Sequence, residues 1–141
     1  MKKSVIFLIA ILYIVSIVVV TFFGMQINID QFQVYMTNIE ITNYDQIVGE
    51  DKYKIINFDD NEGYVSVFVD YQTGPENASH PEKVSFTLVG NTYTDEAGNV
   101  TVYAEVSANG EVVFYTRKMV RVIITTTDGS SLSDSMNIIC R

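Results

Sequence analysis

The stretch VTVYAEVSANGEVVFY, residues 100–115, decides the fold class of this chain. Apolar side chains occupy every second position from Val100 to Val106, which is the period of a strand with one buried face. Asn109-Gly110 separates this run from a second strand-like run, residues 111–115. An Asn-Gly pair between two such runs predicts a β-hairpin, because a tight type I′ turn needs positive φ at both of its positions.

The predicted hairpin also has a predicted register. A two-residue turn pairs Ser107 with Val112 and Val106 with Val113. The shared face, which we expect to be buried, then carries Val102, Ala104, Val106, Val113 and Tyr115. A charge introduced at Val102 should therefore be strongly destabilising, because it would be buried without a partner.

Strand-like runs continue in both directions from this hairpin, and no helical pattern interrupts them after residue 33. We predict the other strands at residues 34–42, 52–58, 64–71, 83–90, 119–127 and 133–140. Loops rich in Asn, Asp, Gly and Pro separate them, and Asp128-Gly129 marks a further turn. Seven or eight strands at this spacing predict an all-β fold, an immunoglobulin-like antiparallel β-sandwich over residues 34–141.

One segment resembles a known family of domains. Residues 94–110 (TDEAGNVTVYAEVSANG) are similar to the TD-x-x-G-x-(V/A)-T-V segment of bacterial immunoglobulin-like surface domains of the invasin and intimin type. The resemblance implies a sandwich fold on a bacterial cell surface, with this segment forming a turn and a core strand. It implies no site residues. The chain lacks the Cys…Trp…Cys pattern of antibody-type domains, since it has no Trp and one Cys.

The start of the chain has a different character. Residues 4–24 (SVIFLIAILYIVSIVVVTFFG) contain no charged residue. As a helix, this run is about 30 Å long, which is roughly the thickness of a bilayer's hydrocarbon core. We therefore predict a cytoplasmic stub and transmembrane signal-anchor helix over residues 1–24, a short connector over 25–33, and a β-sandwich ectodomain over 34–141.

The flanking charges predict the orientation of this anchor. Lys2 and Lys3 precede the run, whereas residues 25–51 contain no Lys or Arg. The positive-inside rule then places the N-terminus in the cytoplasm and the C-terminal domain outside a plasma membrane that the chain crosses once. Cleavage as a secretory signal peptide is the alternative, although Phe22 and Phe23 occupy positions where a cleavage site needs small residues.

The excess of acidic residues limits which classes of molecule can bind this chain. The chain has 9 basic and 17 acidic residues, so without Lys2 and Lys3 the outer part carries seven minus 17, or −10. Such a surface disfavours nucleic acid as a partner. Cys140 is the only cysteine, so an intrachain disulfide is impossible. We expect Cys140 to end the last strand as a small apolar residue, and a disulfide between chains is the alternative.

We predict no catalytic, cofactor-binding or metal-binding residue, no cofactor, and no enzymatic activity. His80 is the only histidine and lies in a polar loop, without a zinc-ligand spacing or a nucleophile motif around it. Acidic residues at 59–62 (DDNE) and at Asp95 and Glu96 offer oxygen ligands for calcium, but no complete EF-hand loop surrounds them. We interpret both groups as solvated turns.

The sequence contains candidate residues for two kinds of covalent modification. Asn77 and Asn99 begin N-glycosylation triplets, a pattern that also arises by chance. Some bacterial immunoglobulin-like domains form a Lys–Asn isopeptide bond promoted by a carboxylate. The nearest candidates here are Lys54, Asn137 and Glu105, but alternation along residues 52–58 predicts that Tyr53 and Ile55 point inward and Lys54 outward.

These observations predict a membrane-anchored extracytoplasmic binding or structural module that contacts another protein or a polymer of the cell envelope. The alternatives are an accessory subunit of a membrane complex, recruited through the helix of residues 4–24, and a small surface hydrolase. Tyrosine is favoured at recognition surfaces but equally in strands, so it does not distinguish them. Seven tyrosines are candidates for exposed positions: Tyr35, Tyr44, Tyr64, Tyr71, Tyr93, Tyr103 and Tyr115.

Overall fold

The computed structural model describes residues 2–24 and 33–141, with side chains described for residues 5–21 and 33–141. It divides into two compact units, Met1–Gln33 and Val34–Arg141, and each is presented by itself. Residues 25–32 of the predicted connector lie outside the described residues, as do the side chains of Lys2, Lys3, Phe22 and Phe23.

The first unit contains helix α1, which runs from Lys2 to Gly24 over 23 residues. Its run of β-branched residues would favour a strand in water, but here it is helical. Within the described part of the chain, no helix combines the length and the hydropathy needed to cross a membrane.

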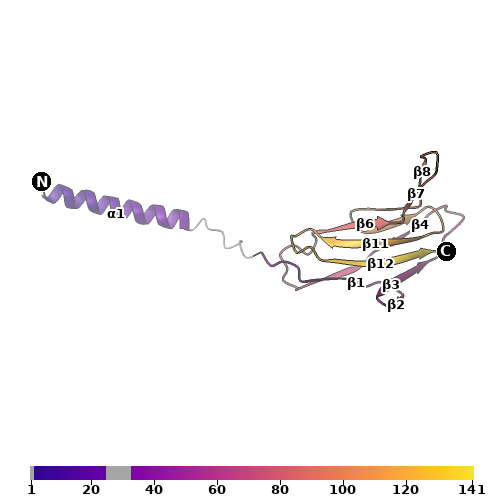
Figure 1. Cartoon of the computed structure of the whole chain (residues 1–141). Coiled ribbons are helices and arrows are strands. Elements are labelled where there is room, and N and C mark those ends of the chain that lie inside the picture. Colours follow the sequence, from indigo (N-terminus) through magenta and orange to yellow (C-terminus); the bar gives the residue numbers. More distant parts are fainter. Residues whose placement is uncertain (1, 25–32) are drawn as a thin grey trace. The chain divides into compact units, whose positions relative to one another are not determined.

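The second unit confirms the prediction of an all-β domain (Figure 1). Its described residues form the following strands: β1 (Asn38–Ile41), β2 (Gln46–Val48), β3 (Asp51–Ile56), β4 (Val65–Phe68), β5 (Tyr71–Gly74), β6 (Val84–Val89), β7 (Thr92–Thr94), β8 (Val100–Val102), β9 (Ala104–Val106), β10 (Glu111–Phe114), β11 (Met119–Thr126) and β12 (Ser133–Cys140). The strands are more numerous than predicted because several predicted runs are interrupted. Val69 and Asp70 separate β4 from β5, and Tyr103 separates β8 from β9.

The strands form one large sheet and three small ones. The five-stranded sheet has the order β2-β3-β12-β11-β6, and the small sheets are β4-β10-β9, β1-β5 and β7-β8. The prediction of a wholly antiparallel arrangement is wrong at one pair, because β3 and β12 run parallel. A parallel pair needs a long connection, and here almost the whole domain lies between the two strands.

The hydrophobic core lies between the five-stranded sheet and the strands β1, β9 and β10. Alternation in β11 and β12 points one face of the large sheet inward. The buried cluster comprises Ile39, Ile41, Val69, Ala104, Val112, Phe114, Val120, Val122, Ile124, Met136, Ile138 and Cys140. Cys140 is 3% exposed and serves as an apolar core residue at the end of the last strand.

The hairpin at Asn109-Gly110 forms, but its predicted register is wrong by one residue. Val106 pairs with Val112 instead of Val113, so the loop has three residues. Gly110 has a φ of +82°, whereas Asn109 does not have positive φ. A shift of one residue exchanges the two faces of a strand. Val112 and Phe114 are therefore buried, and Tyr115, which was predicted to be inward, is exposed.

The segment that resembles invasin-type domains also differs from expectation. The resemblance implied a core strand after the turn, but all three residues of β8 are exposed. Val102 is 38% exposed, so the prediction that it is a buried core residue is wrong. Only Ala104, after the break at Tyr103, is fully buried. The break lets the chain leave the two-stranded sheet β7-β8 and enter the three-stranded sheet β4-β10-β9, which alternation alone does not reveal.

Strand β3 presents the opposite faces to those predicted. Cross-strand partners share a face, and Lys52 and Lys54 pair with the buried Met136 and Ile138. Tyr53 pairs with Asn137 on the other face. The prediction placed Tyr53 inward because it weighed hydrophobicity alone, whereas β3 lies near the edge of the sheet, where a lysine can reach polar partners.

Candidate functional site

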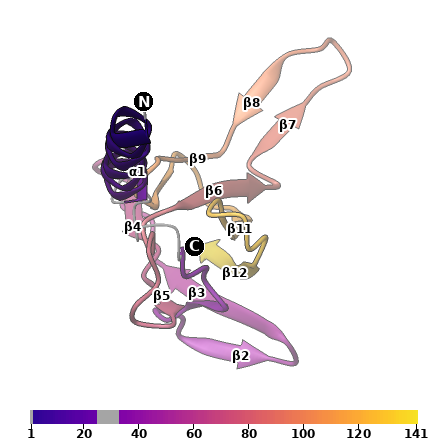
Figure 2. The same ribbon diagram turned by 90° about the vertical axis from the view of Figure 1, so that its left-hand side faces the viewer.

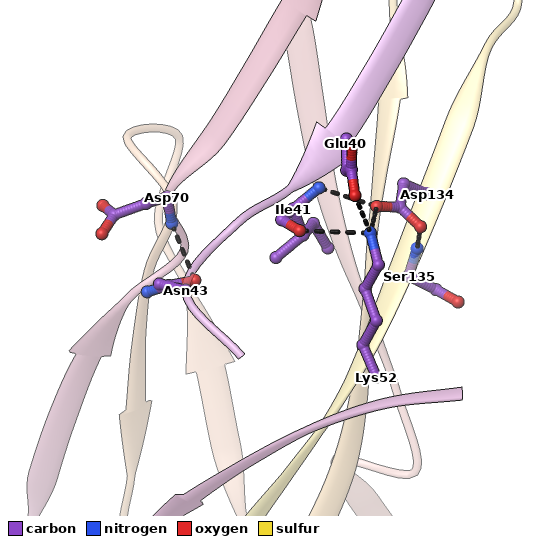
Figure 3. Close-up of polar contacts among 7 residues, drawn as sticks. All are labelled: Glu40, Ile41, Asn43, Lys52, Asp70, Asp134 and Ser135. Carbon is purple, nitrogen blue, oxygen red and sulfur yellow. Dashed lines mark hydrogen bonds and ion pairs between the residues drawn. The ribbon is translucent and has the colours of Figure 1, made fainter. Parts of the chain in front are cut away.

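A polar cluster joins three strands of the domain (Figure 3). It consists of Glu40 and Ile41 of β1, Lys52 of β3 and Asp134 of β12. Lys52 Nζ donates to Asp134 Oδ2 at 2.6 Å and to the carbonyl oxygen of Ile41 at 3.1 Å, with Glu40 Oε1 at 3.5 Å. The backbone N–H of Ile41 donates to the same Asp134 oxygen at 2.7 Å. One carboxylate thus fixes β1 against the large sheet.

The electrostatics of this polar cluster favour an ion pair. Burial alone would lower the pKa of Lys52, but the hydrogen bond to Asp134 and the charges of Asp134 and Glu40 raise it above its usual value. Burial alone would raise the pKa of Asp134, but Lys52 and the N–H groups of Ile41 and Ser135 hold it below its usual value. At neutral pH the lysine is therefore an ammonium group and no nucleophile.

The candidates for an isopeptide bond do not come together. Lys54 Nζ donates to Asp45 Oδ1 at 3.1 Å, whereas Glu105 accepts from the hydroxyl of Tyr115 at 2.9 Å. Asn137 is 8% exposed and pairs with Tyr53 and Arg121 in the large sheet. Lys54 and Glu105 therefore have other hydrogen-bond partners, and the carboxylate that would promote the bond is engaged elsewhere.

Two further side-chain networks fix the loops of the domain. Asn43 donates to the carbonyl of Phe68 at 2.6 Å and accepts from the N–H of Asp70, so the loop after β1 is held to the β4–β5 break (Figure 3). Asp128 accepts from the N–H of Met36 at 2.8 Å and from Ser130. These hydrogen bonds lower the pKa of Asp128 to about 2, against the opposing effect of burial.

The loop residues that the sequence offered for metal or acid-base chemistry are separate from one another. His80 Nδ1 lies 3.2 Å from Glu82 in an exposed loop, and Asp60 pairs with Arg117. Among the residues that the structure describes, no group of three or more His, Cys, Asp or Glu side chains is placed to hold a metal ion. Asp59 accepts from the backbone and side chain of Asn61, as expected for a turn.

The feature best placed to meet a partner is the hairpin β7–β8, which Figure 2 shows extending away from β6 and β11. All of its strand residues are exposed. Its apolar side chains are Tyr93, Val100 and Val102, which are 55%, 62% and 38% exposed. An isolated two-stranded hairpin is marginally stable in water, so it gains from any surface that covers it.

The tip of this hairpin is nevertheless well ordered by its own side chains. Asp95 Oδ1 accepts from the N–H groups of Ala97 and Asn99 at 2.9 and 2.8 Å, and Oδ2 accepts from the Asn99 amide. These bonds, above all those from Asn99, lower the pKa of Asp95. Gly98 supplies the positive φ of the turn. Asp95 therefore shapes the tip, and the amide of Asn99, the second glycosylation candidate, is part of that structure.

The hairpin itself was not predicted: Tyr93 is one of the seven tyrosine candidates, and residues 91–99 were expected to lie in a loop between the strands at 83–90 and 100–106. The alternation in TYT and VTV on the two sides of the turn is compatible with a pair of strands, but it does not tell whether these strands enter the core. Searches with this chain find no matching family model, no matching curated protein and no matching solved structure.

Proposed function

We propose that this chain is a single-pass, membrane-anchored module of the bacterial cell surface whose domain, residues 34–141, binds another protein or an envelope polymer. The hairpin β7–β8 is the contact element. The observation that carries the proposal is that this hairpin exposes both of its faces, with three apolar side chains, on a domain that otherwise has a closed core.

The strand order supports an immunoglobulin-like sandwich. Strand β5 pairs with β1, strand β4 pairs with β10, and only two residues separate β4 from β5. The two small sheets therefore follow one another, and their strands have the order β1, β5/β4, β10, β9. The other layer has β12, β11 and β6 as neighbours. These two orders correspond to the ABED and GFC sheets of immunoglobulin domains. The hairpin β7–β8 is then an insertion between two strands of this framework.

The sequence of α1 supports a membrane anchor. The uncharged run covers residues 4–24. It is therefore longer than the part of α1 whose side chains the structure describes, which is residues 5–21. Twenty apolar residues in a helix suffice to cross a bilayer. With Lys2 and Lys3 on the cytoplasmic side, the domain is extracytoplasmic.

The chemistry of the hairpin supports binding rather than catalysis. Tyr93 combines an aromatic surface with a hydroxyl group, and recognition surfaces favour tyrosine. Its position is fixed by the ladder of β7 and β8 and by the ordered tip at Asp95. A preorganised element loses less entropy on binding than a flexible loop does.

The binding experiment uses the full-length chain in its native membrane. A photoreactive residue placed at Glu96 should cross-link a partner, and the double variant Tyr93→Ala, Val100→Ser should reduce that product at least about tenfold. Tyr64→Ala is the matched control, because Tyr64 is 51% exposed but lies outside the hairpin. Equal cross-linking by the hairpin variant and the control would show that the hairpin is not the contact.

Two further experiments test the anchor. Protease added outside intact cells should remove the domain and leave the N-terminus protected, whereas a soluble domain that begins near Met25 would demonstrate cleavage. Replacing residues 4–24 with an unrelated membrane helix should leave the cross-link intact. Its loss would instead favour an accessory subunit recruited through the helix.

A further inference from the structure

The outer face of the five-stranded sheet is a second exposed surface, distinct from the hairpin. Cross-strand pairing places three rows of residues on this face. The rows are Ile55, Ile139 and Met119; Tyr53, Asn137, Arg121 and Val89; and Ser135, Ile123 and Thr87. Met119 and Val89 are 54% and 52% exposed, and Ile55, Ile123 and Ile139 are partly buried.

The three rows, together with the adjacent Asp51, carry no net charge. In these rows and at the adjacent Asp51, the charged side chains are Arg121 and Asp51, and they form an ion pair with each other. The chain after the helix carries seven basic and 17 acidic residues. Two copies that approach each other therefore repel through most of their surface, but not through this face.

The opposite outer face, on the sheet β4-β10-β9, provides the contrast. There Val113 lies beside Glu105 and Ser66, and Glu111 lies beside Phe68. Both glutamates are on the solvent side, so a second copy of this acidic face would be repelled. The neutral sheet face is thus the large strand surface that suits a second copy of this chain electrostatically.

The size of the neutral sheet face fits a weak pair. Strands of three to eight residues, at about 4.8 Å spacing and about 3.3 Å per residue, give a surface of roughly 500 Å². Stable complexes bury about 800 Å² per partner, so this contact alone is at the weak end. A shared membrane raises the effective concentration of the partners and strengthens such a contact. In that respect the inference rests on the anchor proposed above.

We propose that two copies of this chain associate through the outer face of the five-stranded sheet, around Arg121 and Ile123, as a two-fold pair. Ile123, Ile139 and Met119 supply the apolar contact. In a two-fold pair each Arg121 lies opposite the same face of the other copy, so the ion pairs with Asp51 can be shared across the contact. The hairpin β7–β8 is not part of this contact.

Cross-linking of the full-length chain in membranes tests this proposal. Cys140 is buried, so an introduced cysteine is the reactive thiol. Ile123→Cys, treated with a short bis-maleimide, should give a homodimer, and Val113→Cys on the acidic face should give at least about tenfold less. Both are partly buried β-branched residues in mid-strand, which makes the pair well matched. Equal dimer yields, or a larger product containing another protein, would overturn the proposal.

A charge variant provides the second test. Ile123→Glu makes the neutral face acidic in both copies and should abolish fluorescence transfer between donor- and acceptor-labelled chains in vesicles, whereas Val113→Glu should not. Persistence of the transfer in Ile123→Glu would contradict the proposal. The hairpin variant Tyr93→Ala, Val100→Ser should leave the transfer unchanged. The experiment therefore distinguishes loss of the homodimer from loss of the partner contact at the hairpin.

Discussion

Lys52 and Asp134 form an ion pair of 2.6 Å although 82 positions separate them in the sequence. The pair connects β3 to β12, the two strands that run parallel, and Asp134 also binds the backbone of β1. It therefore joins the beginning and the end of the domain's chain.

Removing Asp134 should destabilise the domain more than removing Lys52. Asp134→Ala leaves the Ile41 N–H and the Lys52 ammonium without their acceptor, and we expect a loss of about 2 kcal/mol. Lys52→Met leaves the carboxylate with two backbone donors, and we expect about 1 kcal/mol. Urea unfolding of the full-length chain in detergent, followed by near-ultraviolet circular dichroism, measures both. The more exposed Lys54→Met serves as control, and an inverted order would refute this account.

Asp128 should make the domain sensitive to acid. Its pKa is about 2 when folded and about 4 when unfolded, so the unfolded state takes up the proton first as pH falls. The stabilisation is complete above about pH 4 and is lost between about pH 4 and pH 2. Asp128→Asn should lower the free energy of unfolding at pH 7 and flatten its decline below pH 4. An unchanged pH profile in this variant would contradict the assignment.

The observed register of the β9–β10 hairpin places two neighbouring valines in different environments. Val112 is completely buried, and its neighbour Val113 points outward. Val112→Asp should cost several kcal/mol or prevent folding, since it buries an unpaired charge, and Val113→Asp should cost about 1 kcal/mol or less. Thermal unfolding of the two variants measures the difference. Equal melting temperatures would mean that the register is wrong.

Gly110 should tolerate a side chain less well than Gly98 does. Both have positive φ, so valine causes backbone strain of about 1–2 kcal/mol at either position. A Cβ at Gly110 would also lie 2.8 Å from the ring of Phe86, whereas nothing lies within 4 Å at Gly98. We expect Gly110→Val to be the more destabilising by about 1–3 kcal/mol. The difference should shrink in the background Phe86→Leu, which provides the control.

Cys140 should be inert in the folded protein. Burial raises the pKa of its thiol, and 3% exposure denies access to reagents. A maleimide should label the thiol only as fast as the domain unfolds, and should label it at once in urea. Rapid labelling of the native chain would show that β12 is less protected than the structure indicates.

The all-β class followed from local patterns, because alternation and turn residues are properties of neighbouring positions. The strands β11 and β12 were predicted almost to the residue for this reason. The register at Asn109-Gly110 was wrong because the same dipeptide fits a two-residue and a three-residue loop. The choice between them depends on contacts of Phe114 and Val112 with distant strands.

The polar cluster could not be predicted from the sequence for a similar reason. Lys52 and Asp134 carry no local signal, and only the parallel pairing of β3 with β12 brings them together. That pairing also places Lys52 and Lys54 on the inner face of β3 and Tyr53 on its outer face, which is the reverse of what hydrophobicity predicts. The exposed hairpin was missed because Thr-rich strands look like any other strand until the core is seen to be complete without them.

The position of β12 has a consequence for the synthesis of this protein. In chain order β12 follows all the other described strands, yet it lies between β3 and β11 in the middle of the large sheet. The sheet therefore remains divided into β2-β3 and β11-β6 until β12 has been synthesised. Until then the edges of β3 and β11 are unpaired, and unpaired strand edges favour aggregation.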